Sequence, residues 1–126
     1  MKLDRIHHVA IIASDYEKSK DFYVNKLGFE ILRENYREAR NDYKLDLRLG
    51  ECEIELFGIA NAPKRPNYPE ACGLRHLAFK VDCIEEVVAE LNALGIETEP
   101  IRWDEYTESK ATFFKDPDGL PLELHE

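Results

Sequence analysis

Two histidine–glutamate pairs recur in this chain of 126 residues at one separation. From His8 to Glu55 is 47 residues (55 − 8). From His76 to Glu123 is again 47 residues (123 − 76). Each histidine opens an apolar run, and each glutamate stands between two aliphatic residues. One imidazole and one carboxylate from each copy make four nitrogen and oxygen ligands, a set that suits a divalent metal ion.

Further likeness between the two copies extends beyond these four positions. Gly28 follows the first histidine by 20 residues (28 − 8) and Gly95 follows the second by 19 (95 − 76), and each glycine ends a helical pattern. The period of 68 residues (76 − 8) is too long for a solenoid repeat. The sequence therefore indicates a tandem duplication within one domain, or two small modules that share a sheet.

Strand and helix patterns follow one another in the same order in both copies. In the first copy Ser14 and Glu17 form a capping-box signature that opens the helix, and strands are predicted over residues 5–13, 29–36, 43–49 and 52–58. In the second copy Asp82 and Glu85 repeat the signature, and strands are predicted over residues 75–81, 97–103, 109–115 and 120–125. Each copy is therefore predicted to be a βαβββ module, which places the fold in the α+β class.

The stretch 60–73 holds three prolines and one glycine and is predicted to link the copies. We predict a single domain over residues 1–126, with module one at about 4–59 and module two at about 74–126.

Taken alone, each of the four residues favours a structural role, because single histidines and glutamates in strands are common. The matched spacings favour a metal site instead, since a carboxylate on the inner face of a sheet needs a partner. His7 competes with His8 for the first position. Only His8 gives the 47-residue spacing, so His7 is expected to face solvent or an interface.

Composition excludes several classes of partner. The formal net charge of −9 works against binding to nucleic acid or anionic lipid. The N-terminus is expected to be neither a signal peptide nor a membrane span. An odd set of cysteines without a CxxC pair predicts reduced thiols and a cytoplasmic protein; they are Cys52, Cys72 and Cys83.

The chain resembles the vicinal oxygen chelate superfamily, and within it the glyoxalase I-like branch. The residues that carry the resemblance are His8, Ser14-Asp15, Asp21-Phe22-Tyr23, Leu27-Gly28-Phe29, Gly50 to Leu56, Gly73 to Phe79, and Phe114 to Leu124 with its Asp-Pro-Asp-Gly turn. The resemblance implies paired βαβββ modules that form a half-barrel around a metal site. It also implies chelation of vicinal substrate oxygens, which stabilises an anionic intermediate.

Glyoxalase I-type enzymes use two histidines and two glutamates, and the matching positions here are His8, Glu55, His76 and Glu123. The resemblance implies one divalent metal per site, Ni²⁺, Zn²⁺, Co²⁺ or Mn²⁺, with two waters completing an octahedral shell. It also implies a small-molecule substrate and a homodimer, with the ligands drawn from one chain or from two.

Two departures from the glyoxalase I pattern concern the substrate. Related enzymes place an arginine four residues after the first histidine and an asparagine four residues after the first glutamate, both for glutathione. This chain has Ile12 and Ile59 there. Lys80 follows the second histidine by four residues, and either binds an anionic substrate group or lies at a strand end with its charge in solvent.

We therefore expect a metal-dependent lyase or isomerase of glyoxalase type that acts on a small hydroxycarbonyl compound, without dependence on glutathione. Glu123 or Glu55 is the expected general base. Three alternatives remain open from the sequence. They are an Fe(II) dioxygenase of extradiol type, a metal-dependent thiol transferase, and a non-enzymatic binding or sequestration protein.

Overall fold

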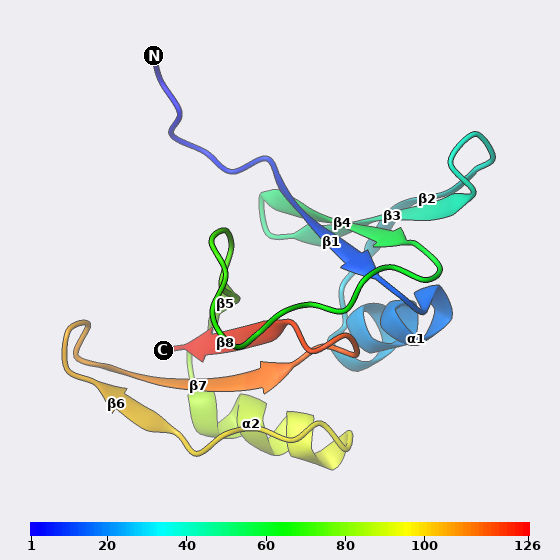
Figure 1. Cartoon of the computed structure of the whole chain (residues 1–126). Helices are drawn as coiled ribbons and strands as arrows, with labels where there is room; N and C mark the ends of the chain where they lie inside the picture. Colours follow the sequence, from blue (N-terminus) through cyan, green and yellow to red (C-terminus); the bar gives the residue numbers. More distant parts are fainter. The chain divides into compact units, whose positions relative to one another are not determined.

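The computed structural model describes all 126 residues and divides the chain into two compact units, Met1–Pro63 and Lys64–Glu126 (Figure 1). The boundary between them falls inside the predicted linker at 60–73. None of the helices is long and apolar enough to cross a membrane.

The first unit holds one four-stranded sheet and one helical segment. The strands lie in the order β1-β4-β3-β2, with β1 parallel to β4 and the other neighbours antiparallel. In chain order its elements are β1 (His8–Ala13), α1 (Tyr16–Lys20), the π-helical turn η1 (Asp21–Lys26), β2 (Ile31–Arg37), β3 (Asp42–Leu49) and β4 (Cys52–Gly58).

The second unit repeats this topology, with strand order β5-β8-β7-β6 and β5 parallel to β8. Its elements are β5 (Leu77–Lys80), α2 (Ile84–Ala93), β6 (Arg102–Asp104), β7 (Ser109–Lys115) and β8 (Pro121–His125). The predicted α+β class with tandem βαβββ modules is confirmed.

Strand alternation gives each sheet a buried face and an open face. In β1 and β4 the residues Ile11, Ile54 and Leu56 are buried, so their neighbours in sequence point to the opposite face. Gly58 allows α1 to approach β4 closely, because a Cβ at this position would lie 2.6 Å from the Cβ of Tyr16. The histidine–glutamate pair of each unit belongs to the open face.

The first helix has a different N-cap from the predicted one, but it ends before Gly28, as predicted. Asp15, and not Ser14, caps it, because the Asp15 side chain accepts a hydrogen bond from the Lys18 amide at 3.1 Å. The helix widens before it ends, since the Leu27 amide bonds to the Phe22 carbonyl at 2.9 Å.

The second helix is capped by a residue distant in sequence. Cys83 occupies the N-cap without a side-chain cap bond, so the predicted capping by Asp82 is wrong. Instead the Ile84 amide donates to Glu126 Oε2 at 3.0 Å. A carboxylate at this helix N-terminus satisfies a free amide and interacts favourably with the helix dipole.

Three predicted strands are shorter in the structure by three or more residues. β1 begins at His8 and not at residue 5, and β5 begins at Leu77 and not at 75. β6 covers only Arg102–Asp104, whereas the prediction was 97–103. Pro100 explains the difference, because proline has no amide hydrogen to donate to the ladder.

Candidate metal centre

The first histidine–glutamate pair lies on the open face of the first sheet. Parallel pairing of β1 with β4 places Ala10 opposite Glu55, so His8 stands two residues before the glutamate's partner. His8 Nε2 lies 3.5 Å from Glu55 Oε2. The histidine side chain is 42% exposed and the glutamate side chain 17% exposed, so the carboxylate is the better shielded of the two groups.

The second pair repeats this arrangement in the second unit. Ala78 lies opposite Glu123, so His76 again stands two residues before the glutamate's partner. His76 Nε2 lies 2.8 Å from Glu123 Oε2. Because both the strand pairing and the register are the same, the equal spacing in sequence corresponds to equal placement on two sheets.

These distances fit donors that share one metal ion. Nitrogen and oxygen donors lie about 2.0–2.2 Å from such an ion, so two of them at right angles are separated by about 3 Å. The two separations, 3.5 Å and 2.8 Å, bracket that value. Imidazole and carboxylate donors also suit the borderline divalent metals. Each unit brings together two of the four predicted ligands, and no cluster of three or more His, Cys, Asp or Glu side chains able to hold a metal occurs in the structure.

Glu55 has a second charged partner that the sequence analysis missed. Lys44 on β3 places its Nζ 3.0 Å from Glu55 Oε1 and 2.6 Å from Asp46 Oδ1. Arg33 on β2 continues the network, with its Nε 2.8 Å from Asp46 Oδ2. A sequence signal existed, because charged residues alternate with Leu45 and Leu47 along this strand.

Electrostatics hold the members of this network in their charged forms. Burial opposes ionisation of Asp46, but the hydrogen bonds from Lys44 and Arg33 outweigh it and keep the pKa of the carboxyl below its usual value. Burial likewise opposes the charge on Lys44, but its bonds to Asp46 and Glu55 outweigh it and raise the pKa of the ammonium. One oxygen of Glu55 is therefore held by a permanent cation, while the other faces His8.

The second histidine–glutamate pair has different surroundings at the equivalent positions of its sheet. Asp46 pairs with Glu55 across the first sheet, and the matching partner of Glu123 across the second is Phe113. The position equivalent to Lys44 is Ala111, which is buried. The His76 ring packs edge-on against Phe113, with centroids 5.2 Å apart. Glu123 is thus flanked by apolar side chains where Glu55 is flanked by charges.

His7 is exposed and also contacts His8. Its Nδ1 is 2.8 Å from Nδ1 of His8, and the two rings meet edge-on. Strand alternation does not separate the two rings, because the strand begins only at His8. The contact engages Nδ1 of His8, and Nε2 of the same ring faces Glu55.

Three further residues lie on the open faces or beside them. Ile12 is 56% exposed and in phase with His8 on β1. Lys80 is exposed, and its Nζ bonds to the Val81 carbonyl at 3.1 Å. His125 follows Glu123 by two residues on β8, but its Nε2 lies 3.2 Å from Thr107 Oγ1.

Comparison with known proteins gives consistent matches over the whole chain. The family model for the Glyoxalase/Bleomycin resistance protein/Dioxygenase superfamily matches residues 5–124. The chain is 60% identical over 127 residues to the uncharacterized protein YwkD of Bacillus subtilis (strain 168), covering 100% of this chain and 99% of that protein. It is 32% identical over 136 residues to a probable lactoylglutathione lyase of Vibrio cholerae serotype O1, covering 98% of this chain and 91% of that protein.

Among solved structures, the crystal structure of the glyoxalase family protein from Enterococcus faecalis superimposes with a TM-score of 0.95 at 65% identity, covering 100% of both chains.

Proposed function

The chain belongs to the Glyoxalase/Bleomycin resistance protein/Dioxygenase superfamily, and from this premise we propose that it is a divalent-metal-dependent lyase or isomerase of glyoxalase type. On this proposal the substrate is a small hydroxycarbonyl compound. The observation that supports it best is the repeated half-site, in which one imidazole nitrogen faces one carboxylate oxygen at 3.5 Å in one unit and 2.8 Å in the other.

The ligands on this proposal are His8, Glu55, His76 and Glu123, and the ion is Ni²⁺, Zn²⁺, Co²⁺ or Mn²⁺. When bound, such an ion acts as a Lewis acid on neighbouring substrate oxygens. The chain's own residues must then hold the substrate and move one proton at its adjacent carbon.

We assign proton transfer to Glu123 and an anchoring role to Glu55, because the contacts of the two carboxylates differ. Glu55 shares one oxygen with Lys44 and the other with His8, so both oxygens are engaged. Glu123 directs Oε2 at His76 and lies opposite Phe113 across the sheet. An apolar flank strengthens the electrostatic interactions of a carboxylate that exchanges a proton with substrate. The Glu123→Gln variant is therefore expected to lose turnover while still binding substrate.

Specificity for glutathione conjugates is not expected. Isoleucine has no side-chain group that can donate a hydrogen bond, so Ile12 and Ile59 cannot replace the arginine and asparagine of glutathione-dependent relatives. Loss of a charged contact to a buried substrate carboxylate costs about 2–5 kcal/mol. Loss of a neutral hydrogen bond costs about 1 kcal/mol more. Together these losses correspond to a fall of roughly 10²–10⁴ in kcat/KM.

Elemental analysis and metal titration of the purified protein test the proposal. His8→Ala and His76→Ala should each lower affinity for the preferred divalent metal by about 10-fold or more, the order found even for losses outside the ligand set. His125→Ala is the matched control, because this histidine lies on the same strand as Glu123 but bonds to Thr107. Unchanged metal content in both ligand variants would contradict the proposal.

Oxygen uptake separates this function from the dioxygenase alternative. An Fe(II) enzyme of the superfamily consumes O₂ with each turnover, whereas a lyase or isomerase converts a hydroxycarbonyl compound without it. Turnover in an anaerobic chamber with Ni²⁺, Zn²⁺, Co²⁺ or Mn²⁺ is the expected result.

A further inference from the structure

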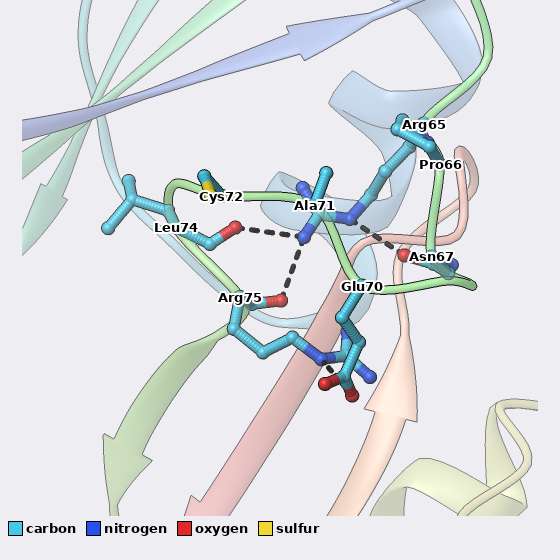
Figure 2. A pocket seen from close by; sticks show the side chains of 8 residues that line it. All are labelled: Arg65, Pro66, Asn67, Glu70, Ala71, Cys72, Leu74 and Arg75. Carbon is cyan, nitrogen blue, oxygen red and sulfur yellow. Dashed lines mark hydrogen bonds and ion pairs between the residues drawn. The ribbon is translucent and has the colours of Figure 1, made fainter.

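Arg65 makes three hydrogen bonds within the segment that precedes β5 (Figure 2). Its Nη2 donates to the carbonyl of Leu74 at 3.0 Å and to the carbonyl of Arg75 at 2.8 Å. Its Nε donates to Asn67 Oδ1 at 2.8 Å. A single guanidinium therefore fixes the backbone immediately before His76.

Asn67 extends these contacts to another part of the second unit. Its Nδ2 donates to the Gly119 carbonyl at 2.9 Å. Gly119 belongs to the turn between β7 and β8, which Asp116 closes by accepting hydrogen bonds from the Asp118 and Leu120 amides at 2.9 and 2.8 Å. The turn leads directly into β8, the strand that carries Glu123.

We propose that Arg65 and Asn67 form a clamp that positions His76 against Glu123. His76 precedes the first residue of β5, so the ladder between β5 and β8 begins only after it, at Leu77. Its position therefore depends on the backbone before it, which Arg65 holds at the carbonyls of Leu74 and Arg75. Asn67 connects the same clamp to the chain entering β8.

The planar guanidinium is suited to this role. Its N–H donors project in a fixed fork, so one side chain can donate hydrogen bonds to two carbonyls and an amide oxygen at once. Lysine carries the same charge on a compact ammonium and cannot reproduce the fork. Both clamp side chains, Arg65 and Asn67, also line a cavity of about 330 Å³ in this segment.

The test uses full-length protein with Co²⁺ as the probe, and this part of the inference rests on the proposed metal function. Arg65→Lys and Asn67→Ala should each lower Co²⁺ affinity by about 10-fold or more, as losses outside the ligand set do. The visible absorption spectrum of bound Co²⁺ should change as well, which a purely structural loss would not cause. Glu70→Gln is the control from the same segment, because it removes the carboxylate charge that faces the Arg75 side chain at 3.1 Å but no bond of the clamp.

A second measurement does not depend on metal. The NMR signals of the His76 ring in the metal-free protein should shift in both clamp variants and stay in place in Glu70→Gln. If wild-type protein binds no Co²⁺, the proposed function fails. The NMR signals of the His76 ring then test the clamp by themselves. Unchanged His76 signals in both Arg65→Lys and Asn67→Ala would overturn the clamp, whatever the metal data show. Asn67→Ala leaves Arg65 in place and provides the milder variant if Arg65→Lys does not fold.

Discussion

Replacing Lys44 by methionine tests the charged network on the open face of the first sheet. The lysine ammonium lies 2.6 Å from Asp46 Oδ1 and 3.0 Å from Glu55 Oε1. Methionine retains most of the side-chain length but carries no charge. The variant leaves Asp46 with Arg33 as its cation and leaves Oε1 of Glu55 without one.

Burial sets the magnitude of the effect. The Lys44 side chain is 26% exposed and that of Asp46 only 3% exposed, so this pair is more shielded than an ordinary surface pair. Complete loss of the partner of a buried charge costs about 3–5 kcal/mol. Because Arg33 remains, we expect a smaller loss, close to that of one hydrogen bond to a charged group, about 1.5–3 kcal/mol in the free energy of unfolding.

The pH dependence follows from the pKa of Asp46. Its pKa is lowered in the folded protein, so the ionised carboxyl contributes stability above its unfolded-state pKa of about 3.9 and loses it as the pH falls through the folded-state pKa. In the variant one of the two compensating hydrogen bonds is gone, and the pKa rises. The destabilisation should therefore be largest near neutral pH and should shrink below about pH 4.

Urea unfolding of the metal-free protein, followed by circular dichroism at neutral and acidic pH, measures both effects. Lys110→Met is the control, since the pair between Lys110 and Glu85 is exposed and such pairs contribute about 0–1 kcal/mol. An equal loss for Lys44→Met at both pH values would refute the electrostatic argument. So would a loss no greater than that of the control.

Three further predictions concern metal, assembly and substrate. Affinity for the preferred metal should fall as the pH falls, because protons compete for imidazole and carboxylate donors. Chelator titrations that give the same metal affinity at every pH would exclude histidine ligation. The protein should be a homodimer, the commonest symmetric assembly, and sedimentation showing only a 14.7 kDa monomer would contradict this. Turnover of the glutathione hemithioacetal of methylglyoxal should be poor, and kcat/KM near about 10⁶ M⁻¹s⁻¹ would overturn the argument from Ile12 and Ile59.

The bounds of two strands, β4 and β7, could be predicted to the residue from the sequence. The bounds of β4 match the predicted 52–58 because Ile54 and Leu56 are buried on one face. The bounds of β7 likewise match the predicted 109–115. β6 was misplaced because the predicted strand 97–103 contains Pro100, which prevents a continuous ladder, and the observed strand begins only at Arg102.

Interactions between residues distant in sequence could not be predicted. The carboxylate that meets the N-terminus of α2 comes from Glu126, which follows the helix by three strands. No local pattern connects Ile84 with that residue. In the site, spacing alone identified the histidine–glutamate pairs, but the contact between Lys44 and Glu55 depends on the register of β3 with β4.

The two units share one backbone arrangement, but the side chains around their glutamates differ. Equal register in the two sheets places a histidine and a glutamate in the same relation twice. At the adjacent position the sheets differ, with Lys44 in one and Ala111 in the other. A duplication that had remained symmetric would give two carboxylates in the same environment. Here Glu55 contacts the Lys44 ammonium and Glu123 lies opposite Phe113, and this difference is the basis of the separate roles that we propose for the two carboxylates.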